Sequence, residues 1–85
     1  MQTSINSSII SDFKIYPNPF NNELFIKTTN PIKNLSIVDI LGTVYYNTNA
    51  NDTFTSLRTD SFKAGIYFCI LKLNNNTIII SKIIK

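Results

Sequence analysis

The chain has only two glycines and three prolines, and four of these five residues fall within three short segments. The segments are Tyr16-Pro17-Asn18-Pro19-Phe20, Asp39-Ile40-Leu41-Gly42 and Ala64-Gly65-Ile66-Tyr67. Because proline fixes φ and glycine opens the φ > 0 region, the sequence specifies the backbone geometry at these three points. The stretches between and after them have strand-like patterns, so the chain is predicted to be a compact all-β module.

Apolar and polar residues alternate in short runs, which is the pattern of half-buried strands. Turn residues separate the runs, notably Thr29-Asn30-Pro31 and the Asn-rich stretch 47–51. The breaks predict seven strands, at residues 13–16, 23–28, 35–39, 43–47, 53–57, 66–73 and 77–84. Seven strands joined by short turns, with no helix-period segment, favour an antiparallel β-sandwich, with a small barrel as the second choice.

Two of the marked segments have specific expected geometries. Pro17 and Pro19 make a rigid extended corner, in which Asn18 is expected to bond the local backbone. Asp39 and Gly42 fit the first and fourth positions of a tight hairpin turn.

The run 66–73 is predicted to be a central strand, because it is apolar on both faces over most of its length. Within it Tyr67 is expected to lie in the core, and Cys69 is expected to be a buried structural residue. Phe62, in the crossover before this strand, is predicted to anchor the core. The Asn74-Asn75-Asn76 segment after the strand supplies a turn whose residues tolerate φ > 0.

The bulk composition describes one small domain. Eighty-five residues with 44% apolar content can bury a modest core, which excludes disorder over most of the length. Residues 1–12 are polar and aperiodic, so they are predicted to be a linker, followed by the domain at 13–85. No stretch reaches the ~18 apolar residues that a membrane helix needs, so direct membrane insertion is not expected.

Charge and side-chain chemistry argue against several function classes. The net charge is +3, but the basic residues are spread evenly along the chain, so no nucleic-acid-binding face is expected. The chain has no histidine, one glutamate and one cysteine, and it lacks zinc-ligand spacings, phosphate-binding loops and dinucleotide motifs. Neither enzymatic activity nor a cofactor is expected.

Four segments occur in a fixed order along the chain: Tyr16-Pro17-Asn18-Pro19, Asp39-Ile40-Leu41-Gly42, Ser61-Phe62-Lys63-Ala64-Gly65-Ile66-Tyr67-Phe68 and the closing Ser81-Lys82-Ile83-Ile84-Lys85. Together they resemble the type A C-terminal sorting domain of type IX secretion, a system of the Bacteroidota. Each motif alone is common, but their order and spacing make the resemblance specific. It runs from about Phe13 to Lys85, with one departure at Asn74-Asn75-Asn76, where relatives often carry glycine.

The resemblance implies a seven-stranded immunoglobulin-like sandwich that acts as a delivery label for an upstream cargo. In this family an N-terminal signal peptide of the precursor directs it across the inner membrane. The sorting domain then directs the cargo from the periplasm through an outer-membrane translocon. Residues 1–12 have no signal-peptide pattern. The implied partners are translocon and shuttle proteins and a surface sortase-like peptidase, which cuts within or before residues 1–12 and attaches cargo to lipopolysaccharide. The implied location is the outer-membrane surface or the medium.

The terminal run, residues 78–85, is flat, apolar and β-prone, which makes it a pairing hazard on a sheet edge. We therefore expect a translocon component to recognise it by β-augmentation, with Lys82 and Lys85 providing orientation. The candidate recognition residues are Ile80, Lys82, Ile83, Ile84 and Lys85. The residues expected to determine the fold are Pro17, Asn18, Pro19, Asp39, Gly42, Gly65 and Tyr67.

Two other functions stay open on the residues alone. An adhesive or carbohydrate-binding module would use exposed aromatic residues such as Tyr45, Tyr46 and Phe54 as a stacking platform. An oligonucleotide-binding barrel would need a basic and aromatic face. Pairing of edge strands would give a homodimer, which the sequence neither requires nor excludes.

Overall fold

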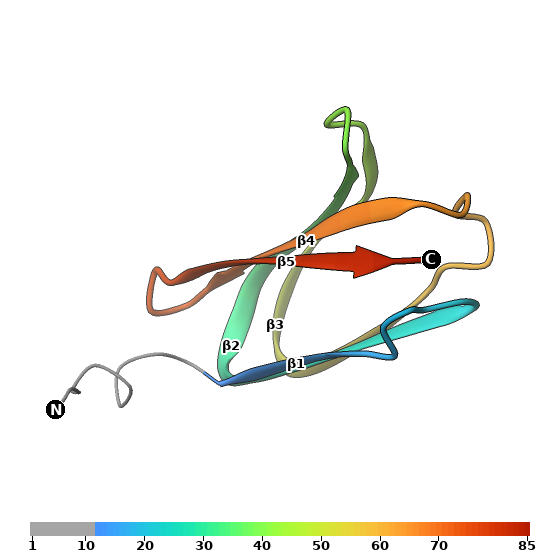
Figure 1. Cartoon of the computed structure of the whole chain (residues 1–85). Coiled ribbons are helices and arrows are strands. Elements are labelled where there is room, and N and C mark those ends of the chain that lie inside the picture. Colours follow the sequence, from blue (N-terminus) through green and yellow to red (C-terminus); the bar gives the residue numbers. More distant parts are fainter. Residues whose placement is uncertain (1–11) are drawn as a thin grey trace, which may run out of the picture.

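The computed structural model describes residues 12–85, and every regular element in that range is a strand (Figure 1). The strands are β1 (Phe13–Tyr16), β2 (Glu23–Asp39), β3 (Val44–Arg58), β4 (Ile66–Leu73) and β5 (Ile78–Ile84). The predictions for 13–16 and 66–73 are confirmed residue for residue, and the last strand begins one residue later than expected. Apart from residue 12, the predicted linker lies outside the described residues. The described part contains no helix that could cross a membrane.

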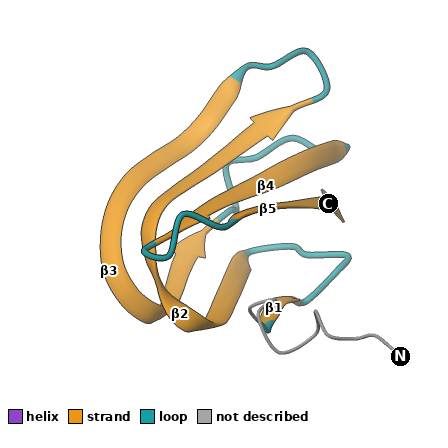
Figure 2. Ribbon diagram, turned by 90° about the vertical axis from the view of Figure 1, so that its left-hand side faces the viewer, coloured by secondary structure: helices purple, strands orange, loops and turns teal. Residues whose placement is uncertain are grey.

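Strand β2 organises the sheet because it pairs with three other strands, all antiparallel to it. Its first half lies between β1 and the end of β3, and its second half lies between the start of β3 and β4. Among the strands of residues 12–85, β5 pairs only with β4, on the side of β4 away from β2. Figure 2 shows β2 and β3 curving together, so that the single sheet curls into a half-barrel around its core.

The structure has five strands where seven were expected, because two predicted breaks lie within continuous strands. The first, Thr29-Asn30-Pro31, falls inside β2 at a register shift between Lys27 and Ile32. Proline is tolerated at such an irregularity, where the ladder does not need its missing N–H. The Pro31 carbonyl accepts a hydrogen bond from the Asn74 N–H at 3.0 Å.

The second predicted break, residues 47–51, falls inside β3. Its asparagines bridge to β2: Asn34 Nδ2 donates to Asn49 Oδ1 at 2.9 Å, and Asn47 Nδ2 donates to Ser36 Oγ at 3.1 Å. Asparagine is common in loops because its side chain bonds nearby backbone, but here it bonds across strands instead. The structure therefore shows one curled five-stranded sheet and not a seven-stranded immunoglobulin-like sandwich.

A bulge at Lys33 lets both halves of β2 direct a row of buried apolar residues to the inner face. Between Ile32 and Asn34, β2 advances two residues while its partner β4 advances one. The extra residue reverses the alternation. Buried positions in β2 are consequently even-numbered up to Ile32 and odd-numbered from Leu35 onward.

The core is made of side chains on the concave face of the curled sheet and from two connecting segments. Phe62, the predicted anchor, is buried among them, as are Tyr67 and Cys69. The buried apolar residues are Phe20, Leu24, Ile26, Ile32, Leu35, Ile37, Leu57, Phe62, Tyr67, Cys69, Leu71, Leu73 and Ile83.

The turns predicted at Asp39-Ile40-Leu41-Gly42 and at Asn74-Asn75-Asn76 both have the expected geometry. The Asp39 carboxylate accepts hydrogen bonds from the N–H groups of Leu41 and Thr43, each at 2.9 Å. Gly42 has a φ of 86°, which an L side chain rarely adopts. The turn between β4 and β5 is likewise confirmed, because Asn76 has a φ of 68°.

Replacement of Ile37 by alanine tests the core assignment. The Ile37 side chain is fully buried, so Ile37→Ala is expected to lower the free energy of unfolding by about 2–5 kcal/mol. The matched control is Ile40→Ala on the exposed turn, which is expected to change it by less than about 0.5 kcal/mol. Urea denaturation of both variants measures this, and equal losses would contradict the assignment.

Candidate recognition surface at the terminal strand

Strand β5 lies at an edge of the sheet, and its two sides differ. Its odd-numbered residues bond toward β4: the Leu73 N–H donates to the Thr77 carbonyl at 2.9 Å, and Gly65 and Lys85 exchange two hydrogen bonds of 2.9 and 3.0 Å. Antiparallel ladders alternate residue by residue. The backbone groups of residues 78, 80, 82 and 84 therefore point to the free side of β5.

The side chains of β5 alternate in the same way between the outer face and the core. Ile78 and Ile80 are 60% and 65% exposed, and Lys82 and Ile84 are also exposed. Ile83 is fully buried. Of the five candidate recognition residues, Ile83 therefore lies in the core, because its position in the strand alternation points inward.

Asn18 covers the free side of β5 at its end. Its Oδ1 accepts from the Ile84 N–H at 3.0 Å, and its Nδ2 donates to the Lys82 carbonyl at 3.3 Å. The neighbouring Phe20 N–H donates to the Ile84 carbonyl at 2.8 Å. The prediction that Asn18 bonds local backbone is wrong, since its partners are 64 and 66 residues away. The Asn18 side-chain amide thus makes the hydrogen bonds that a neighbouring strand would otherwise make with the end of β5.

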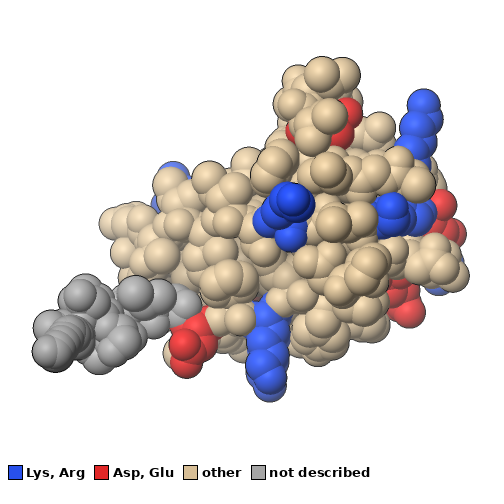
Figure 3. Space-filling model, viewed as in Figure 1, with Lys and Arg blue, Asp and Glu red and all other residues tan. Residues whose placement is uncertain are grey.

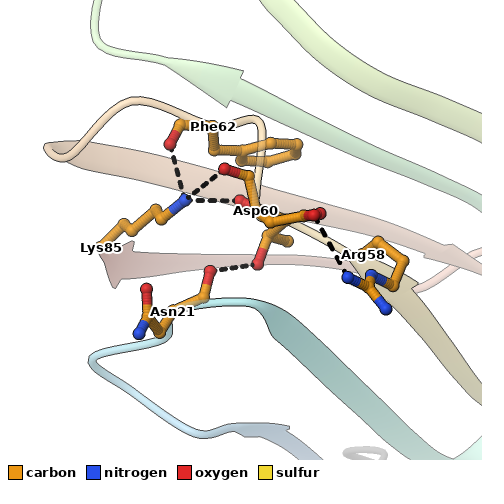
Figure 4. Close-up of polar contacts among 6 residues, drawn as sticks. Asn21, Arg58, Asp60, Phe62 and Lys85 are labelled. Carbon is orange, nitrogen blue, oxygen red and sulfur yellow. Dashed lines mark hydrogen bonds and ion pairs between the residues drawn. The ribbon is translucent and has the colours of Figure 1, made fainter.

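Lys85 is held by the loop that precedes β4 (Figure 4). Its Nζ donates to the carbonyls of Thr59 and Phe62 at 2.6 Å each, and to that of Asp60 at 3.3 Å. Three acceptors match the three donors of an ammonium group. The Lys85 side chain thus ties the chain end to this loop and is not directed toward solvent as the proposed orienting role requires.

The same loop is tied to the segment that follows the Pro-Asn-Pro motif. Thr59 is fully buried, and its Oγ1 donates to the Asn21 carbonyl at 2.7 Å (Figure 4). Its N–H donates to the Asn22 carbonyl at 2.8 Å. Arg58 and Asp60 form an exposed ion pair at 3.2 Å, and hydrogen bonding to Arg58 lowers the pKa of Asp60. This surface pair contributes little to stability, whereas the buried threonine fixes the loop.

A cluster of aromatic side chains in the core packs next to the loop that holds Lys85. The Tyr67 ring lies 5.9 Å from Phe20, 5.4 Å from Phe62 and 5.0 Å from Tyr45 between ring centroids. The Tyr67 hydroxyl donates to the Lys63 carbonyl at 2.6 Å. Burial, with a further contribution from Tyr45, raises the pKa of Tyr67. Tyr67 is therefore a core residue, as predicted.

The three marked sequence segments meet at one end of the molecule. Asp39 pairs with Tyr67, and Tyr67 pairs with Ile83. The start of the hairpin turn is therefore level, across the sheet, with the end of β5. Gly65, which has a φ of 154°, pairs with Lys85. Pro17 and Pro19 flank Asn18 and follow cis peptide bonds. Residues far apart in the sequence thus surround the last four residues of the chain.

The described residues show no arrangement typical of a catalytic or metal site. Among residues 12–85, no three His, Cys, Asp or Glu side chains gather as metal ligands would. Burial raises the pKa of the Cys69 thiol to about 12, which keeps it protonated. On the face seen in Figure 3, the basic side chains stand apart and do not form a patch.

The aromatic platform considered for an adhesive module does not form as expected. Tyr45 packs against the core through Phe62 and Tyr67, and Tyr46 also packs against the core. Phe54 lies near the other end of β3, where it stacks on Phe25 at 6.2 Å. Which aromatic side chains of β3 are exposed could not be predicted from the sequence, because the strand curls and its register shifts.

Comparison with known proteins identifies this type of module. Residues 14–85 match the family described as the secretion system C-terminal sorting domain. The chain is also 34% identical over 74 residues to an endo-acting ulvan lyase from Formosa agariphila. That match covers 84% of this chain but 14% of the lyase, so the chain spans a small part of that relative.

The all-β fold and the motifs around its terminal strand thus define a targeting module that is not itself catalytic. The chain belongs to the secretion system C-terminal sorting domain family, and it is a sorting domain of the type IX system. A protein that carries it is secreted or displayed at the cell surface, and the domain interacts with the secretion machinery.

Sequence reasoning missed the contacts that hold the chain end. Asn21 and Thr59 contribute a carbonyl and a buried hydroxyl, and no motif marks either of them. Lys85 was expected to face a partner, but its ammonium faces loop carbonyls. These contacts join residues more than 20 positions apart, so local sequence patterns carry little signal for them.

Substitution of Asn18 tests its role at the edge of β5. Asn18→Ala removes the acceptor for the Ile84 N–H, so this amide is expected to exchange faster with solvent. The free energy of unfolding is expected to fall by about 1 kcal/mol. Hydrogen exchange followed by NMR measures the first effect, with Asn51→Ala on the exposed part of β3 as control. Unchanged exchange of the Ile84 amide would contradict the assignment.

Alkaline pH is expected to destabilise the domain through Cys69. In the unfolded chain the thiol ionises near its ordinary pKa of 9.0, whereas the folded pKa is about 12 because of burial. The raised folded pKa contributes stability that is present below pH 9 and is lost as pH rises toward 12, by about 1.4 kcal/mol per unit.

Urea denaturation between pH 8 and 11 measures this loss. Cys69→Ala lacks the titrating group, so its stability is expected to fall less steeply over the same range. Identical slopes for the two proteins would show that the thiol does not carry the effect.

Proposed function

We propose that the domain guides its cargo through the outer-membrane translocon by adding β5 to a strand of a translocon component. The observation that carries the proposal is the partly open edge of β5. Within residues 12–85, no hydrogen-bond partner covers the outward backbone groups of Ile78 and Ile80, whereas those of Ile84 are covered. Such an edge is a template for β-augmentation.

The open part of the edge has a defined length. Asn18 and Phe20 occupy the backbone groups of Ile84 and the carbonyl of Lys82, so an incoming strand fits only from residue 78 to the N–H of Lys82. Ile78 and Ile80 supply apolar contacts on the outer face of this stretch. Lys82 carries the exposed charge beside it and provides orientation.

Ile83 and Lys85 then have a supporting role. Ile83 fixes the strand in the core, and the Lys85 ammonium fixes its end to the 59–62 loop. Together they hold the open edge in one position, which lowers the entropic cost of ordering a partner strand on it.

The later steps of export follow the expectations for the family. Shuttle proteins carry the cargo from the translocon, and a surface sortase-like peptidase removes the domain and attaches the cargo to lipopolysaccharide. The cut falls within or before residues 1–12, most of which lie outside the described residues. Retention of the domain on secreted cargo is the alternative outcome.

Ile80→Pro separates edge pairing from folding. The substitution removes the outward N–H at this position and no hydrogen bond to β4, so the domain is expected to remain folded. A reporter that carries an export signal and this domain is expected to lose surface delivery in a type IX-competent host. Ile80→Thr keeps the backbone donor and serves as the matched control, with delivery close to wild type.

The outcome is measured by surface labelling of the reporter and by urea denaturation of the purified domain. A folded Ile80→Pro domain that still reaches the surface would overturn edge pairing but not the sorting role. Normal delivery after removal of the last few residues would do the same. Delivery without the whole domain would overturn the sorting role itself.

A further inference from the structure

Three aromatic rings form a row on the outer face of the other half of the sheet, away from the core. We call them the aromatic strip: Tyr16 of β1, Phe25 of β2 and Phe54 of β3. The centroids of Tyr16 and Phe25 are 5.5 Å apart with planes at 28°, and those of Phe25 and Phe54 are 6.2 Å apart with planes at 19°. The rings are nearly parallel and span three neighbouring strands, whose paired segments run through the lower part of Figure 1.

The register of the strands places these rings outward. Tyr16 is paired with Phe25, and Phe54 is paired with Lys27, so all lie on the same face. The intervening residues Leu24 and Ile26 point into the core. Tyr16 and Phe54 are 41% and 48% exposed, so the core does not need them. Adjacent exposed rings across strands form a contact surface, which isolated apolar residues do not.

Two unpaired cations lie on the same face. Lys14 is directly opposite Lys27, an arrangement that is unfavourable between like charges. The salt bridge found within residues 12–85 joins Arg58 to Asp60 and involves neither lysine. Lys14, Tyr16 and Lys27 line one open hollow together. Both lysines also line a neighbouring hollow with Asp12, which forms no ion pair with either of them. An anion bound between the lysines would relieve their repulsion.

We propose that this face binds an anionic polysaccharide. The rings offer apolar surface to the C–H groups of sugar rings, and the lysine pair offers charge-assisted hydrogen bonds to a carboxylate or sulfate. The Ser56 hydroxyl, on the same face opposite Phe25, can bond sugar hydroxyls. The binding face is distinct from the free edge of β5, so the proposal does not depend on the sorting mechanism.

The charge density favours a glycan over a nucleic acid. A nucleic acid carries a phosphate on every unit, and its binding proteins gather several basic residues to neutralise them. Here two lysines without an ion-pair partner accompany three rings. Arg58 is paired with Asp60, Lys33 lies at the bulge of β2, and Lys63 and Lys72 lie outside the three strands. This ratio suits a chain of sugar rings in which only some units carry charge.

The test is calorimetric titration of the whole 85-residue chain with oligosaccharides from alginate, which carries carboxylates, and from dextran sulfate, with neutral dextran as reference. Binding of at least one anionic probe, weakened by salt and absent with dextran, is expected. Phe54→Ala and Phe25→Ala are each expected to weaken binding about tenfold. The matched control is Tyr46→Ala, whose ring lies outside the strip and is expected to leave binding unchanged.

The lysine pair gives a second, independent readout. Lys14→Gln with Lys27→Gln is expected to weaken binding roughly tenfold and to reduce its salt dependence, while stability is kept or raised because the repulsion is removed. Lys72→Gln is the control for charge alone. The unfolding midpoint of each variant shows whether it is folded.

Several results would overturn the proposal. These are no binding of either anionic probe, equal binding of dextran, or tighter binding of a single-stranded DNA oligomer of equal charge. Loss of a homodimer in the strip variants, without any glycan effect, would assign the rings to self-association instead.

Discussion

The last residue of the chain is fixed by its backbone and by its side chain, and the arrangement of one whole end of the molecule depends on this. Gly65 pairs with the Lys85 backbone, while the Lys85 ammonium meets three carbonyls of the 59–62 loop. Bonds from a charged donor are stronger than neutral ones. Because the same loop is bonded to Asn21 and Asn22, the fixed chain end also places the Pro-Asn-Pro segment against β5.

An exposed strand edge is usually a liability, because it can pair with any other strand. This domain limits the exposed length: Asn18 and Phe20 close one end of β5, and Lys82 places a charge beside the open part. The aromatic strip lies on the outer face of β1, β2 and β3 and not on this edge. One small domain therefore presents two surfaces with different chemistry, one made of backbone groups and one of rings and cations.

The sequence predicted short-range features well and long-range ones poorly. The strands at 13–16 and 66–73, the Asp39–Gly42 turn and the buried roles of Phe62 and Tyr67 follow from local patterns, and the structure confirms them. The strand count was wrong because the register shift that accommodates Pro31 within β2 and the cross-strand asparagine bonds have no local signature. Recognition by the five candidate residues stays a prediction, since a partner must be present to test it; the structure places Ile83 in the core and bonds the Lys85 ammonium to a loop.

The hydrogen bonds that Asn18 and Phe20 make with the final strand reach its main-chain atoms. Substitutions at the outward positions 78, 80, 82 and 84 therefore leave that attachment intact. Side chains at these sites can therefore change the apolar and charged contacts with a partner while the backbone presents the same geometry to the export apparatus. A transport system that accepts many different cargo proteins would tolerate sequence variation in the terminal strand, because the backbone conformation of that strand does not depend on its outward side chains.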